Sequence, residues 1–292
     1  VVLTRVWKYR GGQFTLCERT LLMGVVNITP DSFSDGGRFF SRDAAIEHAL
    51  KLQDDGADLL DLGAESTRPE SQPVPDDEQL RRLIPVLEPL TSKIAIPISV
   101  DTTSATVARE CLQAGASVIN DTSGFHHDPG LPEVCAAFEA GVVLMHIKGT
   151  PEMMQREPRY DDLFREIHAY LSASVAAAER ANIPRECVLV DPGIGFGKTF
   201  EDNYRLLGRL FHFRDLATGV LAGPSRKAFT GEFSQLPADQ RQFPTAAAVA
   251  LAVLHGADVV RVHDVHEMKQ VVDILDRFRA IQDRDARGTT NR

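Results

Sequence analysis

The chain has 292 residues, 43% of them hydrophobic and 25% charged, which is the composition of an ordinary globular protein. It carries 32 basic and 41 acidic residues, a net charge of −9, so we expect neither nucleic acid nor an anionic membrane surface among its partners. No apolar run reaches the roughly 18–20 residues that cross a bilayer, and residues 1–5 lack the layout of a signal peptide. Four widely spaced cysteines favour small buried side chains over disulfides or a metal site. These features predict a cytoplasmic protein.

Short apolar runs alternate with longer amphipathic stretches along the chain, which is the pattern of repeated strand–helix units around a parallel sheet. Residues 1–20, with a turn at 10–13, are expected to form an N-terminal β-hairpin that caps the bottom of the barrel. The expected strands are 21–27, 59–65, 96–102, 117–122, 142–147, 188–192, 218–223 and 259–265. The expected helices are 42–55, 77–90, 105–114, 131–140, 163–181, 200–209, 245–255 and 265–281, followed by a polar tail over 284–292. Eight such units without a linker predict an α/β protein with one domain over residues 1–292, a (β/α)8 TIM barrel.

In a TIM barrel the site lies at the C-terminal ends of the strands and in the loops that follow them. Asp101, Asn120 and Asp191 end the third, fourth and sixth expected strands, so their side chains can project inward beneath a flat ring. Carboxylates and amides match the donors and acceptors along the edge of an aminopyrimidinone. The alternative is that they are hydrogen-bonding residues of the barrel interior or helix caps. Asp101 stands just before a Thr-Thr-Ser run and could cap the next helix.

Cationic side chains follow the second, seventh and eighth expected strands, near the usual phosphate corner of such a barrel. They are Arg68, Lys227, Arg261 and His263. Arginine binds phosphate in a bidentate way and lysine acts as a point charge; the alternative is a set of ordinary surface salt bridges. Asn27 offers a hard oxygen that could complete the shell of a Mg²⁺ ion bridging phosphates.

Two other patterns are read as structural. The segment 192–199 resembles a phosphate-binding P-loop, but Pro192 stands where that motif requires its first glycine. His126, His127 and His146 have no carboxylate at the spacing of zinc ligands.

The strand-end motifs together resemble the dihydropteroate synthases, a family of pterin-binding transferases. Residues 25–37, Val-Val-Asn-Ile-Thr-Pro-Asp-Ser-Phe-Ser-Asp-Gly-Gly, resemble the first signature of the family, and residues 61–69, Asp-Leu-Gly-Ala-Glu-Ser-Thr-Arg-Pro, resemble the second. Further motifs follow in family order at 99–102, 119–121, 145–151, 191–193, 225–227 and 261–264. The likeness covers about residues 20–282.

The resemblance implies an activity in folate biosynthesis. Family members condense 6-hydroxymethyl-7,8-dihydropterin pyrophosphate with p-aminobenzoate, which gives 7,8-dihydropteroate and pyrophosphate. The reaction is S_N1-like: pyrophosphate departs and the arylamine attacks the pterin-methyl cation, so positioning and charge stabilisation carry the rate. The resemblance also implies a Mg²⁺ cofactor, a homodimer, sensitivity to sulfonamides, and two mobile loops that close after the pyrophosphate substrate has bound.

The resemblance assigns roles to individual residues. The pterin would be held by Asp101, Asn120, Asp191 and Lys227, with Met145 and Phe196 packed nearby and Ser225 also among the substrate-binding residues. The pyrophosphate would be held by Asn27, Arg68, Arg261 and His263, and Asn27 would also bind Mg²⁺. The p-aminobenzoate would lie among Phe33, Thr67, Pro69, Lys227 and Ala228. The catalytic group is Asn27, Asp101, Lys227, Arg261 and His263.

The sequence departs from the family pattern at three positions. Glu70 replaces a glycine in the second loop, Ala228 replaces a serine, and Ile194 replaces a phenylalanine. Two rival functions share the expected barrel. A pterin-binding methyltransferase has no use for the 27–33 loop or the Ser-Arg-Lys run at 225–227, and a silent binding barrel has no use for the anion-binding positions; a turnover assay decides between them.

Overall fold

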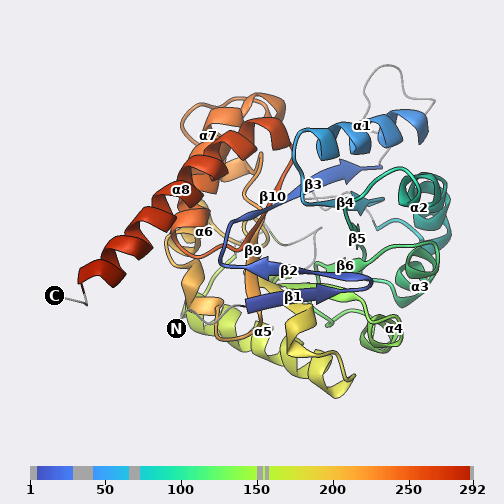
Figure 1. Cartoon of the computed structure of the whole chain (residues 1–292). Coiled ribbons are helices and arrows are strands. Elements are labelled where there is room, and N and C mark those ends of the chain that lie inside the picture. The colour runs from blue at the N-terminus through green and yellow to red at the C-terminus, as the bar shows by residue number, and fades with distance from the viewer. Residues whose placement is uncertain (1–4, 29–41, 66–72, 150–153, 155–157, 290–292) are drawn as a thin grey trace.

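Eight parallel strands close into a barrel in the computed structural model, which describes residues 5–28, 42–65, 73–149, 154 and 158–289 (Figure 1). Around the barrel the strands follow the order β10, β3, β4, β5, β6, β7, β8, β9, so the last strand pairs with the first. The strands are β3 (Leu21–Asn27), β4 (Leu59–Gly63), β5 (Ile98–Asp101), β6 (Val118–Asp121), β7 (Gly141–Met145), β8 (Val188–Asp191), β9 (Gly219–Ala222) and β10 (Val259–Val262). The helices are α1 (Arg42–Asp54), α2 (Asp76–Thr91), α3 (Ala105–Gln113), α4 (Leu131–Ala137), α5 (Leu163–Arg180), α6 (Phe200–Leu207), α7 (Gln242–Leu254) and α8 (Val265–Thr289). The predicted TIM barrel is confirmed.

The barrel strands and the α-helices differ from the sequence expectation at their ends. Strand β4 stops at Gly63 rather than at residue 65, because its ladder with β3 ends at the pair Asn27–Gly63. Strand β10 stops at Val262, since Val265 already begins helix α8. Helix α8 continues to Thr289, so the tail expected from residue 284 begins inside this helix. No helix among the described residues is long and apolar enough to cross a membrane.

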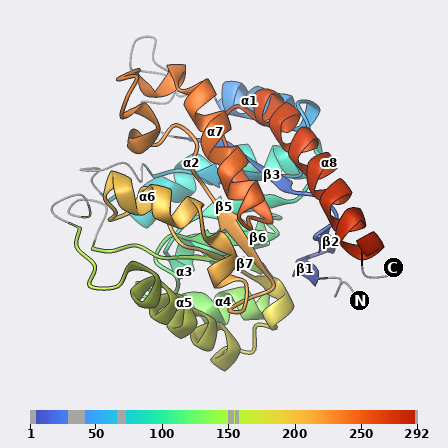
Figure 2. The same ribbon diagram turned by 90° about the vertical axis from the view of Figure 1, so that its left-hand side faces the viewer.

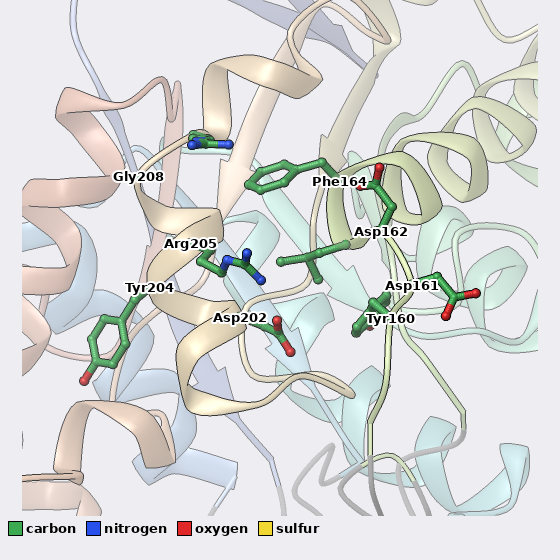
Figure 3. Close-up of a pocket in the computed structure, with 10 residues that line it drawn as sticks. Tyr160, Asp161, Asp162, Phe164, Asp202, Tyr204, Arg205 and Gly208 are labelled. Carbon is green, nitrogen blue, oxygen red and sulfur yellow. The ribbon is translucent and has the colours of Figure 1, made fainter.

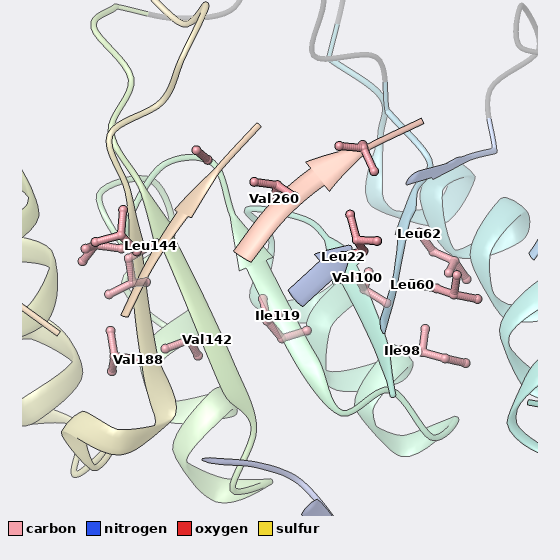
Figure 4. Close-up of a cluster of buried hydrophobic side chains, with 14 of the residues drawn as sticks. Leu22, Leu60, Leu62, Ile98, Val100, Ile119, Val142, Leu144, Val188 and Val260 are labelled. Carbon is pink, nitrogen blue, oxygen red and sulfur yellow. The ribbon is translucent and has the colours of Figure 1, made fainter. Parts of the chain in front are cut away.

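Side chains alternate along each barrel strand between the outside and the inside, because successive residues of a strand point to opposite faces. The outward side chains pack against the helices in one large core, which includes Leu22, Leu60, Val100, Ile119 and Val142 (Figure 4). Both faces of these parallel strands are covered, which explains why their sequences are almost continuously apolar.

A second apolar cluster fills the inside of the barrel at its lower end, where the strands begin. The hairpin contributes Trp7 and Leu16, and the barrel contributes Leu21, Met23, Leu59, Val118, Val143, Leu189, Leu221 and Val259. Trp7 is fully buried, and its indole Nε1 donates a hydrogen bond to the carbonyl oxygen of Cys187 at 3.2 Å. The apolar filling ends below the C-terminal ends of the strands, where polar side chains take over.

The predicted N-terminal hairpin is confirmed as well. Strands β1 (Arg5–Tyr9) and β2 (Gly12–Leu16) pair in antiparallel register across the lower end of the barrel. Figure 2 shows them together at one end of the barrel. The guanidinium of Arg5 pairs with the carboxylate of Asp258 at 2.6 Å, which ties the hairpin to the turn before β10.

Candidate active site

The upper end of the barrel interior carries polar side chains at one level. The strand register sets Asn27 beside Gly63, Gly63 beside Asp101, and Asp101 beside Asn120. A Cβ atom added to Gly63 would lie 3.8 Å from both the Oδ1 atom of Asn27 and the Cβ atom of Asp101. The glycine therefore leaves the space between these two side chains open.

Arg261 connects side chains from four strands in one hydrogen-bonded network. Its Nε atom donates to Asp61 Oδ2 at 2.6 Å, and its Nη2 atom donates to Asp101 Oδ2 at 3.2 Å. The amide of Asn120 donates to the same Asp61 oxygen at 3.0 Å. Asp61 is fully buried, so its charge depends on these donors. We call Asn27, Asp61, Asp101, Asn120, Asp191 and Arg261 the polar layer.

Burial and charge act against each other in this network. Burial raises the pKa of Asp101, while the nearby Arg261 guanidinium opposes that rise and Asp61 adds to it. Burial acts to lower the pKa of Arg261, but the carboxylates of Asp61 and Asp101 outweigh it, so that the pKa is raised. Arg261 therefore remains a cation, and Asp101 takes up a proton more readily than a surface aspartate.

Asp191 and Lys227 add two further charged groups, one at the end of β8 and one in the loop after β9. Asp191 ends β8, and its Oδ1 atom accepts a hydrogen bond from the backbone N–H of Gly193 at 2.7 Å. Burial raises the pKa of Asp191 to about 6, against that hydrogen bond and the charges of Lys198, Lys227 and Arg261. Burial, together with the charge of Arg261, lowers the pKa of Lys227 to about 8. Both groups are poised to titrate near neutral pH.

An apolar wall stands beside these charges. Met145, Met154 and Phe196 form a small buried cluster of their own. The Nζ atom of Lys227 lies 3.8 Å from the centroid of the Phe196 ring, a cation–π contact. A Cβ atom added to Gly195 would lie 2.9 Å from Lys227 Cδ, and this glycine has a φ of +83°, so a larger residue would push the lysine away.

Ser225 and His263 form a second pair near the end of β10. The backbone N–H of His263 donates to Ser225 Oγ at 3.2 Å, and the same hydroxyl bonds to the Nδ1 atom of the ring at 2.9 Å. Because the hydroxyl accepts from the backbone, its own proton is available for Nδ1, and a neutral ring then carries its proton on Nε2. Arg226 pairs with Asp264 at 2.6 Å. It therefore links the loops after β9 and β10 and is not part of the polar layer.

The structure also decides between the alternative roles of Asp101 and of Arg261. Ser104, not Asp101, caps helix α3, because its side chain accepts a hydrogen bond from the N–H of Val107. Arg261 lies in a buried network rather than a surface salt bridge. Four residues predicted to bind substrate lie outside the described residues: Phe33, Thr67, Arg68 and Pro69. No group of three or more His, Cys, Asp or Glu side chains within the described ranges could hold a metal ion.

A hollow of about 520 Å³ lies between the start of α5 and helix α6 (Figure 3). It is lined by Tyr160, Asp161, Asp162, Leu163, Phe164, Asp202, Tyr204, Arg205, Gly208 and Arg209. None of the candidate site residues is among them, so this hollow is separate from the polar layer.

Comparison with known proteins bears on the nature of this site. A family model described as pterin binding enzyme matches residues 23–263. The dihydropteroate synthase of Bacillus subtilis is 43% identical over 259 residues, which cover 89% of this chain and 88% of the relative. The chain belongs to the dihydropteroate synthases.

Two solved dihydropteroate synthases share the fold along nearly all of this chain. The Yersinia pestis enzyme with a sulfonamide drug has a TM-score of 0.89 at 38% identity, covering 94% of this chain and 99% of its own. The Burkholderia cenocepacia enzyme with 7,8-dihydropteroate has a TM-score of 0.86 at 37% identity, covering 97% and 100%.

Two buried residues near the site of this dihydropteroate synthase were not among the sequence candidates. Asp61 lies two residues before the end of β4, and a charge at an inward position of an apolar strand is the signal that could have identified it. Lys198 was set aside with the imperfect P-loop, although its ammonium lies 3.0 Å from the Nδ1 atom of His146 and close to Asp191. Nothing in the local sequence indicates that this lysine points into the protein.

Proposed function

We propose that the polar layer binds the pterin of the pyrophosphate substrate. Asp101, Asn120 and Asp191 supply carboxylate and amide groups to the ring edge, and Lys227 supplies a cation beside them. Met145 and Phe196 form the apolar face against which the ring packs. The observation that carries this proposal is the network in which Arg261 fixes Asp61 and Asp101 at the mouth of the barrel.

The pyrophosphate group is assigned to the neighbouring part of the barrel mouth. Arg261 and His263 come from β10 and the residue just beyond it, and Asn27 ends β3, the strand that pairs with β10. A guanidinium and an imidazole can both donate hydrogen bonds to phosphate oxygens. Arg68 is assigned to the same group from its sequence motif alone.

The residues at the end of β3 fit a Mg²⁺ ion that is held mainly by the substrate. Asn27 offers one neutral amide oxygen, and the described residues contain no cluster of carboxylates around it. Mg²⁺ commonly keeps several waters and binds through one or two protein groups plus substrate phosphates. When bound, it would neutralise charge on the departing pyrophosphate.

The chain's own residues then favour departure of pyrophosphate and attack by the arylamine. Arg261 and His263 stabilise the negative charge that develops on the leaving group. The carboxylates of Asp101 and Asp191 lie on the pterin side, where positive charge develops. Phe33, Thr67 and Pro69, together with Lys227 and Ala228, are assigned to p-aminobenzoate, which we expect to bind after pyrophosphate has ordered the first two loops.

We also propose a homodimer that forms through helices α7 and α8, which pack against each other (Figure 1). Ile274, Phe278 and Ile281 recur on one face of α8 and are 72%, 49% and 37% exposed, respectively. Leu251 and Leu254 are exposed on α7. An apolar stripe of this kind supports pairing with a second copy of the chain.

Binding calorimetry with two probes tests the division of the site. Asp191→Asn is expected to weaken pteroic acid at least tenfold, since losing a charged partner costs about 1.5–3 kcal/mol, and to leave the affinity for Mg²⁺-pyrophosphate unchanged. His263→Gln is expected to do the reverse. Equal losses of both ligands in both variants would show that the site is not divided in this way.

A further inference from the structure

Lys198 is a buried lysine to which the proposed substrate contacts give no role. It ends the 192–198 loop after β8, and it is only 1% exposed. Its ammonium donates hydrogen bonds to the Nδ1 atom of His146 at 3.0 Å and to the carbonyl oxygen of Phe196 at 2.9 Å. Both acceptors are neutral, because burial and the nearby Lys198 lower the pKa of His146 to about 2. Burying an ammonium among neutral acceptors is costly unless an opposite charge lies near.

The main source of that opposite charge is Asp191. Asp191 is the carboxylate that most favours the charged form of Lys198, ahead of Asp202 in α6. The loop between them is tightly packed, because a Cβ atom added to Gly193 would lie 1.9 Å from the carbonyl oxygen of His146 and 3.3 Å from Lys198 Nζ. The N–H of Gly193 in turn donates to Asp191, so lysine, loop and carboxylate form one unit.

The same ammonium also fixes the apolar wall of the site. Lys198 holds the carbonyl of Phe196, whose ring contacts Lys227 and packs with Met145. One buried cation therefore reaches both the charged side and the apolar side of the pterin subsite.

We propose that Lys198 is a positioning residue of the pterin subsite, which holds the 192–198 loop closed and supplies the positive charge that balances Asp191 without touching the substrate. The proposal rests on the assignment of Asp191 to the pterin. It gives the lysine of the P-loop-like segment a role that involves no phosphate.

The charged groups around Asp191 and Lys198 determine how the loss of pterin affinity in a Lys198 variant depends on pH. Three cations act on Asp191. They are Lys198 from the loop that follows it, Lys227 from the loop after β9, and Arg261 from β10. Lys198 faces Asp191, Asp202, Lys227 and Lys148. Burial raises the pKa of Asp191 to about 6, and removal of Lys198 would raise it further. Burial also lowers the pKa of Lys198 to about 7, so its charge is present at pH 6 and largely lost at pH 8.5.

The test is the dissociation constant of pteroic acid, measured by calorimetry between pH 6 and pH 8.5 for the wild type, Lys198→Met and Lys198→Arg. The variant-to-wild-type ratio cancels titration of the ligand itself. For Lys198→Met we expect a ratio of about five or more at pH 6 that falls to within about threefold at pH 8.5, because a rise of one unit in the pKa of Asp191 leaves about a tenth of the carboxyl ionised at pH 6, against half in the wild type. Lys198→Arg carries its charge over the whole pH range, so its affinity is expected to match that of the wild type at pH 6, where Lys198 is also charged.

Two further variants separate the possible outcomes. Lys8→Met removes an exposed lysine of the N-terminal hairpin that pairs with Glu186 at 3.0 Å, and it should leave the affinity unchanged at every pH. If Lys198→Met does not fold, Lys198→Gln tests the same loss of charge. A ratio that stays constant with pH, or that stays near one, overturns the role of Lys198. If Asp191→Asn also binds pteroic acid normally, the proposed pterin site itself fails.

Discussion

The buried carboxyl group of Asp191 shows how a single residue can serve binding at the expense of stability. Burial raises its pKa from the ordinary value of 3.8 to about 6, so the folded protein favours the protonated form. A raised folded-state pKa contributes stability that is present below about pH 4 and is lost as pH rises through about 6. Near pH 7.5 the ionised group therefore destabilises the empty protein, by on the order of 1–3 kcal/mol.

The variant Asp191→Asn tests this cost. Its amide oxygen can still accept from Gly193, whereas the buried charge is gone. We expect the variant to unfold at a higher temperature than the wild type at pH 7.5, with a difference that vanishes toward pH 4. Asp264→Asn is the control, because it breaks the ion pair with Arg226 and should lower stability. A destabilised Asp191→Asn protein at pH 7.5 would contradict this reading.

At the scale of elements, the sequence predicts the barrel well because each unit carries its own signals. The inward and outward alternation is visible in β3, where Leu21, Met23 and Asn27 face inward. The ends of the strands are less predictable, since the apolar Ala64 continues the pattern after the ladder has stopped at Gly63. Lys198 could not be placed from sequence, because its direction depends on a loop fold set by distant contacts with His146.

The N-terminal hairpin is the element that closes the lower end of the barrel, far from the polar layer. Trp7→Ala is expected to cost about 3–5 kcal/mol of unfolding free energy, as is usual for a buried tryptophan. Denaturant unfolding should show this loss, and Trp7→Phe should show a smaller one. Activity at a temperature where the variant remains folded should be unchanged, because Trp7 belongs to the lower apolar cluster and not to the polar layer. A large fall in kcat without a fall in stability would contradict this division of roles.

At the scale of the whole molecule, the apolar face of α7 and α8 predicts assembly. Val272 is buried in the core, whereas Ile274 and Phe278 are exposed on the same helix. Ile274→Glu combined with Phe278→Glu is expected to give a monomer in analytical ultracentrifugation. Phe233→Glu, at an exposed phenylalanine outside both helices, should leave the wild-type dimer intact. A monomeric wild type would refute the proposed interface.

Sulfonamides are expected to compete with p-aminobenzoate. The family motifs assign Phe33, Thr67 and Pro69 to p-aminobenzoate, and an aromatic side chain can stack on an arylamine at a gain of about 0.5–1.5 kcal/mol. Phe33→Leu should weaken both ligands in steady-state inhibition and titration experiments. Glu70 and Ala228 depart from the family pattern near this edge and would alter the strength of inhibition rather than its competitive form. Inhibition that persists as p-aminobenzoate is raised would rule out a shared site.

The most direct test of dihydropteroate synthase activity at the polar layer is pyrophosphate release, followed in a coupled assay with purified protein and Mg²⁺. We expect release only when 6-hydroxymethyl-7,8-dihydropterin pyrophosphate and p-aminobenzoate are both present, in a one-to-one ratio with dihydropteroate. Asp101→Asn, in which the partner of Arg261 loses its charge, should lower kcat/KM for the pterin substrate by at least about tenfold while the protein remains folded. No release with both substrates, or an Asp101→Asn variant of undiminished activity, would contradict the account.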